Sequence, residues 1–239
     1  MISQEDKEKA IHDKRKHIRI TSLCNNNCSF CLAGDMSNEG HYEIDRIKKE
    51  LEDGIKEGCT RVILSGGEPS IHPDFPKIIK LAKSIGYKKI QTISNGRMFS
   101  YRKFLNDCIG SGLSEITFSI HGHTSEIHDA LTRTKNAFEQ IIKGIKYALL
   151  TGIIVSSDIV LTKLNYKKFP EIIRFLYTIG IREIDVLHIV PFGSAWKNWK
   201  ILNYDLNDAV PFLHEGLKFA KEKDMVIWTN RFPPKYLFG

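Results

Sequence analysis

Short apolar and β-branched runs alternate with longer stretches of helical periodicity along most of this 239-residue chain. The alternation predicts strand–helix units around a mainly parallel sheet, because parallel neighbours need a crossover between them. We expect six such units. The strand-like runs are residues 17–23, 60–66, 88–94, 114–120, 152–162 and 183–190, and the helical stretches are residues 43–57, 74–85, 100–111, 135–151, 167–179 and 206–222.

Six units fit either an open doubly wound sheet or a barrel, complete or partial. In both folds, right-handed crossovers bring the carboxyl ends of all strands to one rim, where ligands bind. The chemically distinctive segments of this sequence come directly after the strand-like runs. In chain order they are CNNNCSFC (24–31), SGGEP (65–69), SNGR (94–97), HGH (121–123), Asn165 and PFGS (191–194). We therefore expect a ligand site built from these segments.

With 42% hydrophobic and 26% charged residues, the chain can bury one large core. We expect a domain over residues 17–239, open to truncation at its carboxyl end, after a charged extension over residues 1–16. No run of about 18 apolar residues is present, and the opening segment is too charged for a signal peptide, which predicts a cytoplasmic protein without a membrane partner. The net charge is +7, but the lysines are mixed with acids on helical stretches, which argues against nucleic acid as a partner.

Cys24, Cys28 and Cys31 lie within eight residues, which in a reducing cytosol indicates metal binding or catalysis. Thiolates on such a loop can surround one soft centre, as in iron–sulfur proteins. Cys59 begins the second strand, roughly 20 Å from the ligand rim, and Cys108 lies near the end of a helix that returns to the far rim, so both are expected to be buried apolar thiols. A 4Fe–4S cluster held by three cysteines leaves one iron open to an exogenous ligand and so favours chemistry over electron storage.

Other interpretations of the cysteine loop are open. A zinc site would need a further ligand, for which His17 or His41 is available, but the second pair of cysteines is missing. The Cys28–Cys31 pair is formally a thioredoxin-like CxxC, although Cys24 and six strand–helix units have no place in that interpretation. A chance grouping of three cysteines is the weakest alternative.

CNNNCSFC, followed about 35 residues later by SGGEP, resembles the radical SAM superfamily, whose motif is CxxxCxΦC with an aromatic residue at Φ. Phe30 fills the aromatic position, and the resemblance extends over about residues 17–195. It implies a partial (βα)6 barrel with outer helices and a 4Fe–4S cluster on Cys24, Cys28 and Cys31. S-adenosylmethionine (SAM) would chelate the open iron. An electron from a flavodoxin or ferredoxin-like donor would cleave SAM to methionine and a 5'-deoxyadenosyl radical that abstracts hydrogen from a substrate.

The resemblance also implies residue roles. Gly66, Gly67, Glu68 and Pro69 would hold the methionine amino group, and Phe30 would pack near the adenine. The other implied SAM contacts are Ser94, Asn95 and Ser119 near the ribose and methionine, Arg133 at the carboxylate, and Asn165 with the backbone of residues 190–193 at the adenine. Each has a purely structural alternative, namely a plain turn, a core aromatic residue, a strand-end hydrogen bond or a surface arginine.

Three histidines, His121, His123 and His128, follow the fourth strand. His121 and His123 could share one side of an extended segment, but no third ligand of suitable spacing follows them, which argues against a metal site. In the resembling family an acid commonly stands at the place of His121. We predict that His121 is catalytic as a proton donor on the substrate side and that His128 makes a structural hydrogen bond.

The sequence has no cysteine after Cys108, which favours a single cluster, and its end, NRFPPKYLFG, shows no clear final element. We predict an oxidoreductase-like radical SAM enzyme acting on a peptide or protein side chain or on a small metabolite. The alternative is a non-catalytic electron-transfer or redox-sensing iron–sulfur protein. That alternative predicts four protein ligands to the cluster and no dependence on SAM.

Overall fold

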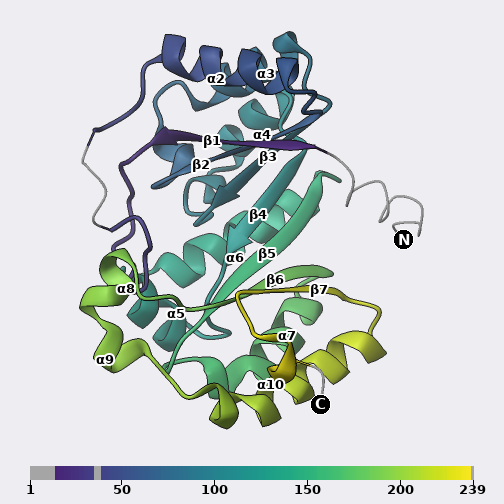
Figure 1. The fold of residues 1–239 in the computed structure, drawn as a ribbon. Helices are drawn as coiled ribbons and strands as arrows, with labels where there is room; N and C mark the ends of the chain where they lie inside the picture. The colour runs from purple at the N-terminus through teal and green to yellow at the C-terminus, as the bar shows by residue number, and fades with distance from the viewer. Residues whose placement is uncertain (1–13, 35–38, 238–239) are drawn as a thin grey trace.

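A computed structural model of the chain describes residues 14–34 and 39–237. Seven strands, all parallel to their neighbours, form one sheet in sequence order: β1 (Arg15–Thr21), β2 (Arg61–Gly66), β3 (Lys89–Ser94), β4 (Glu115–Ser119), β5 (Ile154–Leu161), β6 (Glu183–His188) and β7 (Val226–Asn230). The sheet curls, but β1 and β7 are its two edges and do not pair (Figure 1). The predicted partial barrel with parallel strands is therefore confirmed.

The long helices cover the outer face of the sheet (Figure 1). They are α2 (Ile44–Lys56), α3 (Phe75–Ile85), α4 (Arg102–Ser111), α6 (Ala137–Leu149), α7 (Phe169–Thr178) and α10 (Leu206–Glu222). Shorter segments complete the connections: helices α5 (Ser125–Thr132), α8 (Gly193–Lys197) and α9 (Trp199–Leu202), and 3-10 turns η1 (Pro69–Ile71), η2 (Met98–Ser100), η3 (Tyr166–Lys168) and η4 (Pro234–Tyr236). Helices α3 and α4 end at Gly86 and Gly112, each with φ of 118°, a conformation that glycine adopts without strain.

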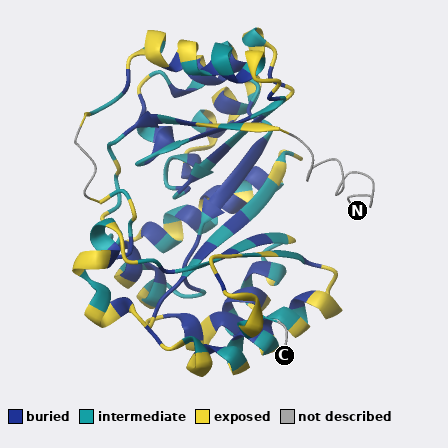
Figure 2. Cartoon of the chain, viewed as in Figure 1, coloured by how far each residue is buried: buried dark blue, intermediate teal, exposed yellow. Residues whose placement is uncertain are grey.

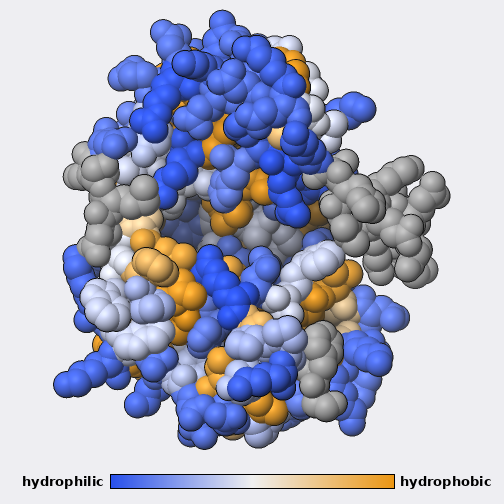
Figure 3. Space-filling view, viewed as in Figure 1, coloured by the Kyte–Doolittle hydropathy of each residue, from blue (hydrophilic) through white to orange (hydrophobic). Residues whose placement is uncertain are grey.

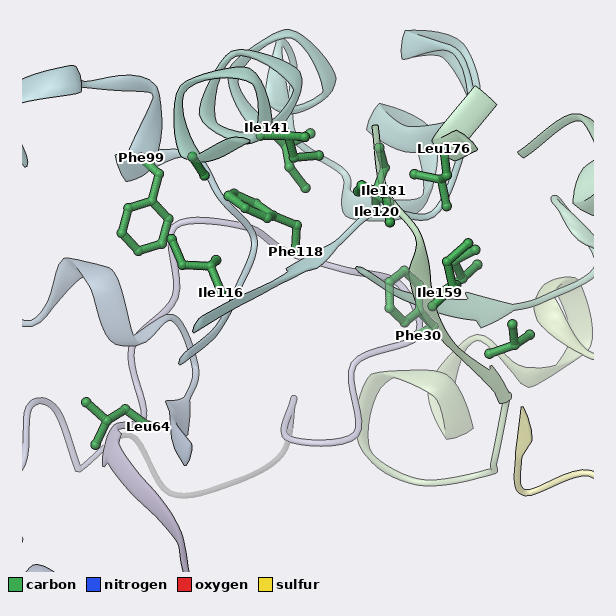
Figure 4. Close-up of a cluster of buried hydrophobic side chains, with 14 of the residues drawn as sticks. Phe30, Leu64, Phe99, Ile116, Phe118, Ile120, Ile141, Ile159, Leu176 and Ile181 are labelled. Carbon is green, nitrogen blue, oxygen red and sulfur yellow. The ribbon is translucent and has the colours of Figure 1, made fainter. Parts of the chain in front are cut away.

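The hydrophobic core lies between the sheet and the outer helices, where both elements turn their buried sides toward each other (Figure 2). Phe118 of β4 meets Phe99 of η2 edge to face at a ring-centroid distance of 6.0 Å, and Ile141 of α6 belongs to the same cluster (Figure 4). Truncating a phenylalanine that is fully buried in this way costs about 3–5 kcal/mol. Phe30, from the cysteine loop, belongs to this cluster, so the loop is packed into the fold.

The inner face of the barrel is polar, because alternate residues of each strand point inward. Near the amino ends of the strands these side chains bond to one another. Arg61 pairs with Glu115 of β4, and Gln91 donates to Thr117 at 2.7 Å. This hydrogen-bonded layer occupies the amino-end half of the barrel, and the carboxyl-end half is left for the loops that follow the strands.

The main departure from the sequence prediction is β7, which was not expected. It is a short edge strand that pairs with β6 alone among the described residues. Trp228 is 44% exposed and none of the five residues is buried, so the strand lacks the alternation of a half-buried strand. The stretch after it also forms an element, the turn η4, where no final element was predicted. Strand β1 begins at Arg15, so residues 15 and 16 belong to the sheet, while residues 1–13 of the predicted extension lie outside the described residues. Within the described part of the chain, no helix is both long and apolar enough to cross a bilayer.

Candidate functional site

The cysteine loop CNNNCSFC follows β1 and lies at the carboxyl-end rim of the sheet. All three of its thiols are free; Cys24 is exposed, and Cys28 and Cys31 are partly buried. Burial raises the pKa of Cys24 to about 11 and raises the pKa of Cys28 further, and the neighbouring thiols add to both shifts. These thiols become thiolates when a bound cation compensates the lost hydration. The donor set therefore fits a cationic metal centre such as an iron–sulfur cluster.

The SGGEP loop, which follows β2, is joined to the segment that leads into the first cysteine. The amide of Gly67 donates to the carbonyl of Thr21 at 2.9 Å, and that of Glu68 donates to the carbonyl of Leu23 at 2.8 Å. A β-carbon on Gly66 would lie 2.1 Å from the Thr21 oxygen, and one on Gly67 would lie 2.2 Å from the Leu23 oxygen. The resemblance implies a contact of these residues with the methionine amino group; the structure gives a reason for glycine at both positions, since two stretches of backbone are in contact there.

Glu68 is the centre of a buried hydrogen-bond network. Its carboxylate accepts from the Ser70 amide at 3.0 Å, and from the Ser94 hydroxyl and the Asn95 amide at 2.7 Å each. Burial raises the pKa of this carboxyl group, although the hydrogen bonds oppose the shift. Pro69 is buried beside it and begins η1. Glu68 thus joins the loop after β2 to the end of β3, and its charge is satisfied within the protein.

The loop after β3 holds the first half of the cysteine loop. The side-chain amide of Asn95 donates to Oδ1 of Asn25 at 2.6 Å. The guanidinium of Arg97 donates to the Asn25 carbonyl and, at 3.1 Å, to Oδ1 of Asn26, while Gln140 accepts from its Nε. Sequence reasoning placed Arg97 in a rim segment but gave it no role; the structure makes it an anchor of the cysteine loop.

Helix α5 holds the second half of the cysteine loop. The amide of Asn27 donates to the Thr132 carbonyl at 3.1 Å, and the amide of Ser29 donates to the Leu131 carbonyl at 2.9 Å. Both acceptors belong to the last turn of α5, where helix carbonyls lack partners within the helix. The loop therefore completes the hydrogen bonding of this helix end.

Helix α8 lies against the end of the same loop. The Ser194 amide donates to the Cys31 carbonyl at 2.9 Å, and the side-chain amide of Asn198 donates to the Ser29 carbonyl at 3.0 Å. Oδ1 of Asn198 in turn accepts from Arg133 at 2.7 Å. Arg133 is exposed, and its bond to Asn198 places it at the rim beside the loop. Asn198 was not singled out from the sequence.

The Phe30 side chain is buried and packs against the His121 ring. Their rings meet edge to face at 4.5 Å, and His128 is parallel to His121 at 5.8 Å. Nδ1 of His121 accepts from the Val160 amide at 3.2 Å, so the neutral ring carries its proton on Nε2. Burial lowers the pKa of His121 well below its usual value, which keeps this ring neutral. The predicted structural hydrogen bond of His128 is present, because its Nδ1 accepts from the His121 amide at 3.2 Å.

Asn165 and Ser119 complete the predicted set. Asn165 is fully buried and donates to the carbonyls of His121 at 2.9 Å and Val160 at 3.0 Å, so its side chain is committed to the fold. Ser119, at the end of β4, bonds to Asp158 on β5. Burial raises the pKa of Asp158 to about 7. The accessible members of the predicted set are thus Gly66, Gly67, Asn95, Ser119 and Arg133.

The other candidate metal ligands lie apart from the loop. Nε2 of His17 is 2.5 Å from Oγ of Ser65, and His41 packs against His72. In the part of the chain that the structure describes, no three histidine, cysteine or acidic side chains are grouped around a single-ion site. Cys59 and Cys108 are buried in the hydrophobic core, as predicted.

A cavity of about 470 Å³ opens inside the barrel next to the SGGEP loop, and Figure 3 shows the hollow in this face. It is lined by His17, Arg19, Ser65, Gly66 and Ile93. Nε of Arg19 is buried without a hydrogen-bond partner among the described residues. Burial and the neighbouring arginines lower the pKa of His17. The alternating sequence KHIRIT indicates that His17 and Arg19 share one strand face, but it does not say which face points inward.

Comparisons with known proteins agree with this geometry. Residues 18–176 match the profile of the radical SAM superfamily. The chain is 26% identical over 230 residues to a probable GTP 3',8-cyclase of Sulfurisphaera tokodaii, covering 95% of this chain and 70% of that protein. It is 28% identical over 224 residues to a probable GTP 3',8-cyclase of Sulfolobus acidocaldarius, covering 93% and 69%.

The fold is similar to that of two solved proteins. Streptococcus suis SuiB bound to the precursor peptide SuiA superposes with a TM-score of 0.73 at 16% identity, over 96% of this chain and 53% of SuiB. Methylornithine synthase (PylB) superposes with a TM-score of 0.66 at 17% identity, over 98% of this chain and 80% of PylB. At these identities the solved structures show the fold alone, and the chain spans about half the length of SuiB.

Proposed function

Because the chain belongs to the radical SAM superfamily, we propose that Cys24, Cys28 and Cys31 hold a 4Fe–4S cluster with one iron open to SAM. When bound and given one electron, the cluster would supply the reductive cleavage of SAM to methionine and a 5'-deoxyadenosyl radical, which would take hydrogen from a substrate. The observation that carries the proposal is the cysteine loop itself. Three free thiols stand on a loop that is fixed by the ends of β2 and β3 and by helices α5 and α8.

We assign the residues around the loop to four groups. Glu68, Ser94 and Asn165 are buried supports whose polar atoms bond within the protein. Gly67 and Asn95 face the loop from the ends of β2 and β3 and would border the methionine part of SAM. Two further groups complete the assignment: Arg133, whose planar guanidinium suits a carboxylate, and Phe30 and Ser119, kept near the adenine and ribose.

The substrate that we propose is a small anionic metabolite held in the barrel cavity. Arg19 gives the β1 wall of the cavity a positive charge, and its Nε lacks a partner among the described residues, as a site for an anionic oxygen would. The curated relatives are named as GTP cyclases, so a purine nucleoside triphosphate is the first candidate. A peptide is the second candidate, because SuiB, which shares the fold, was solved with its precursor peptide.

Anaerobic reconstitution tests the cofactor assignment. We expect about four irons and four sulfides per chain, an electron paramagnetic resonance spectrum of the dithionite-reduced protein that changes on adding SAM, and formation of 5'-deoxyadenosine. An unchanged spectrum with no 5'-deoxyadenosine would favour the electron-transfer or redox-sensing alternative.

Nucleotides test the substrate assignment separately. We expect GTP to bind the reconstituted protein and to increase 5'-deoxyadenosine formation, and Arg19→Gln to weaken GTP binding while leaving the cluster content unchanged. Arg102→Gln, in α4 on the outer side of the sheet, is a matched control for loss of a positive charge. If no nucleotide binds while SAM is still cleaved, the substrate proposal fails and the radical SAM assignment stands.

A further inference from the structure

An apolar patch is exposed on the surface next to the cysteine loop. Leu32, Phe192 and Trp196, here called the rim patch, are 39%, 65% and 63% exposed. Phe192 and Trp196 are one turn apart, since the Trp196 amide donates to the Phe192 carbonyl at 3.3 Å. Figure 3 shows apolar surface beside the hollow, on the side where Figure 1 places α8.

The rim patch is joined directly to the predicted cluster ligands. A β-carbon on Gly193 would lie 2.4 Å from the Leu32 carbonyl oxygen, so the backbones of the two segments are in contact. Ser194, two residues before Trp196, donates its amide to the Cys31 carbonyl at 2.9 Å. A molecule seated on this patch would therefore be next to the third cysteine.

Positive charge surrounds the rim patch. Residues 190–204 contain two lysines, Lys197 and Lys200, and no acid, and both lysines are exposed. Lys163 is exposed beside the end of α9, where its amide bonds to the Leu202 carbonyl at 2.7 Å. An apolar centre with a basic surround fits a protein whose own contact surface is apolar with an acidic surround.

We propose that the rim patch is the docking surface for a protein one-electron carrier with an acidic rim around its redox centre. The inference rests on the proposed function, which requires that an electron reach the cluster. A docked carrier would be oxidised by one electron, which would pass to the cluster held by Cys24, Cys28 and Cys31, and that group would supply the reductive cleavage of SAM to methionine and the 5'-deoxyadenosyl radical. Three apolar side chains and a few charges suit the small, short-lived interfaces of electron-transfer partners.

The test compares two sources of electrons in the reconstituted protein. Dithionite is a small reductant that needs no docking surface, whereas reduced flavodoxin or ferredoxin must dock. In Trp196→Ser we expect 5'-deoxyadenosine formation to stay within about twofold with dithionite and to fall about tenfold with limiting carrier, because buried tryptophans dominate interfaces of this kind. In Lys200→Glu we expect a smaller, few-fold fall with carrier that disappears in high salt.

Leu150→Ser is the matched control, because Leu150 is 78% exposed and follows α6 on the way to the amino end of β5. We expect it to leave both rates unchanged. An equal fall of both rates in Trp196→Ser, or no fall with carrier, would overturn the docking proposal. Conversion of a dimer to a monomer with unchanged electron delivery would assign the patch to a second copy, and loss of nucleic-acid binding alone would assign it to nucleic acid. If the unmodified protein forms no 5'-deoxyadenosine with dithionite, it is the proposed function that fails.

Discussion

The two rims of the barrel use the same residue types in opposite ways. At the amino-end rim the polar side chains pair with each other, as Arg61 does with Glu115, and the thiols of Cys59 and Cys108 are buried in the core. At the carboxyl-end rim polar groups hold a loop in place, while its three thiols form no disulfide and the Nε of Arg19 has no hydrogen-bond partner among the described residues. Residue type alone does not mark a functional site. What marks it is a polar or metal-binding group that the fold holds in a fixed position, at a cost in stability, without using that group to stabilise the fold itself.

The largest expected effect comes from changing one cysteine at each rim. We expect Cys28→Ala to abolish 4Fe–4S assembly, since two thiolates cannot hold the cluster in the proposed way. Cys108→Ala should lower stability by about 1 kcal/mol, the loss of a buried sulfur atom, and keep full cluster content. Iron and sulfide analysis after anaerobic reconstitution measures both. Equal cluster contents in the two variants would remove the functional difference between the rims.

A second comparison uses one glycine from each rim. In Gly67→Ala the new methyl group would lie 2.2 Å from the Leu23 carbonyl oxygen, so the SGGEP loop must move away from the cysteine loop. We expect a loss of about 3 kcal/mol in SAM binding, roughly a hundredfold, from this overpacking. Equilibrium titration of the reconstituted protein with SAM measures it.

Gly110 provides the control for that substitution. It lies in α4, and a β-carbon there would meet no atom within 4 Å. Gly110→Ala should therefore raise the free energy of unfolding by about 0.5–1 kcal/mol through helix propensity and leave SAM binding unchanged. Weaker SAM binding in Gly110→Ala, or normal binding in Gly67→Ala, would contradict the view that only the carboxyl-end rim is tuned for a ligand.

His121 tests whether the carboxyl-end rim contains a proton donor or only supports. If His121 donates a proton to the substrate, His121→Ala should leave SAM cleavage intact and reduce product formation about a hundredfold, the scale of general acid catalysis. His121→Asn offers Oδ1 to the Val160 amide, which His121 Nδ1 now accepts at 3.2 Å. The substrate and 5'-deoxyadenosine products are measured together. Loss of both cleavage and cluster in His121→Ala, with rescue by His121→Asn, would make His121 a support for Phe30 instead.

The predictable part of the fold is the part with regular periodicity. Six strands and six long helices were predicted within about two residues of their ends. Each has a periodic buried face, and a turn or a glycine near its end marks where it stops. Strand β7 was missed since it is an edge strand, paired with β6 alone in the part of the chain that the structure describes. Helices α5, α8 and α9 were missed because they are short. In addition, the last turn of α5 and the first turn of α8 are hydrogen-bonded to the cysteine loop, a contact that local sequence does not encode.

The candidate site divides in the same way. The spacing of the three cysteines and SGGEP pointed to the loop and its neighbour, since both are short continuous motifs. Arg97 and Asn198 could not be assigned a role, because they bond to Asn25 and Ser29 across separations of 72 and 169 residues. Arg19 was missed for a different reason: the strand pattern does not reveal which face lines the cavity.

The smallest effect that we expect is a pH dependence of stability at the carboxyl-end rim. Burial lowers the pKa of His128 from 6.5 to about 4, so on acidification the unfolded chain takes up this proton before the folded protein does. The contribution of neutral His128 is therefore fully present above pH 6.5 and is lost as the pH falls toward 4. Between pH 7 and 5 this amounts to about 2 kcal/mol, at 1.4 kcal/mol per unit. Urea unfolding at both pH values should show a smaller loss in His128→Asn, whose Oδ1 can accept the His121 amide without titrating. An equal loss in both proteins would mean that other groups cause the acid sensitivity, and that burial of neutral His128 does not contribute to it.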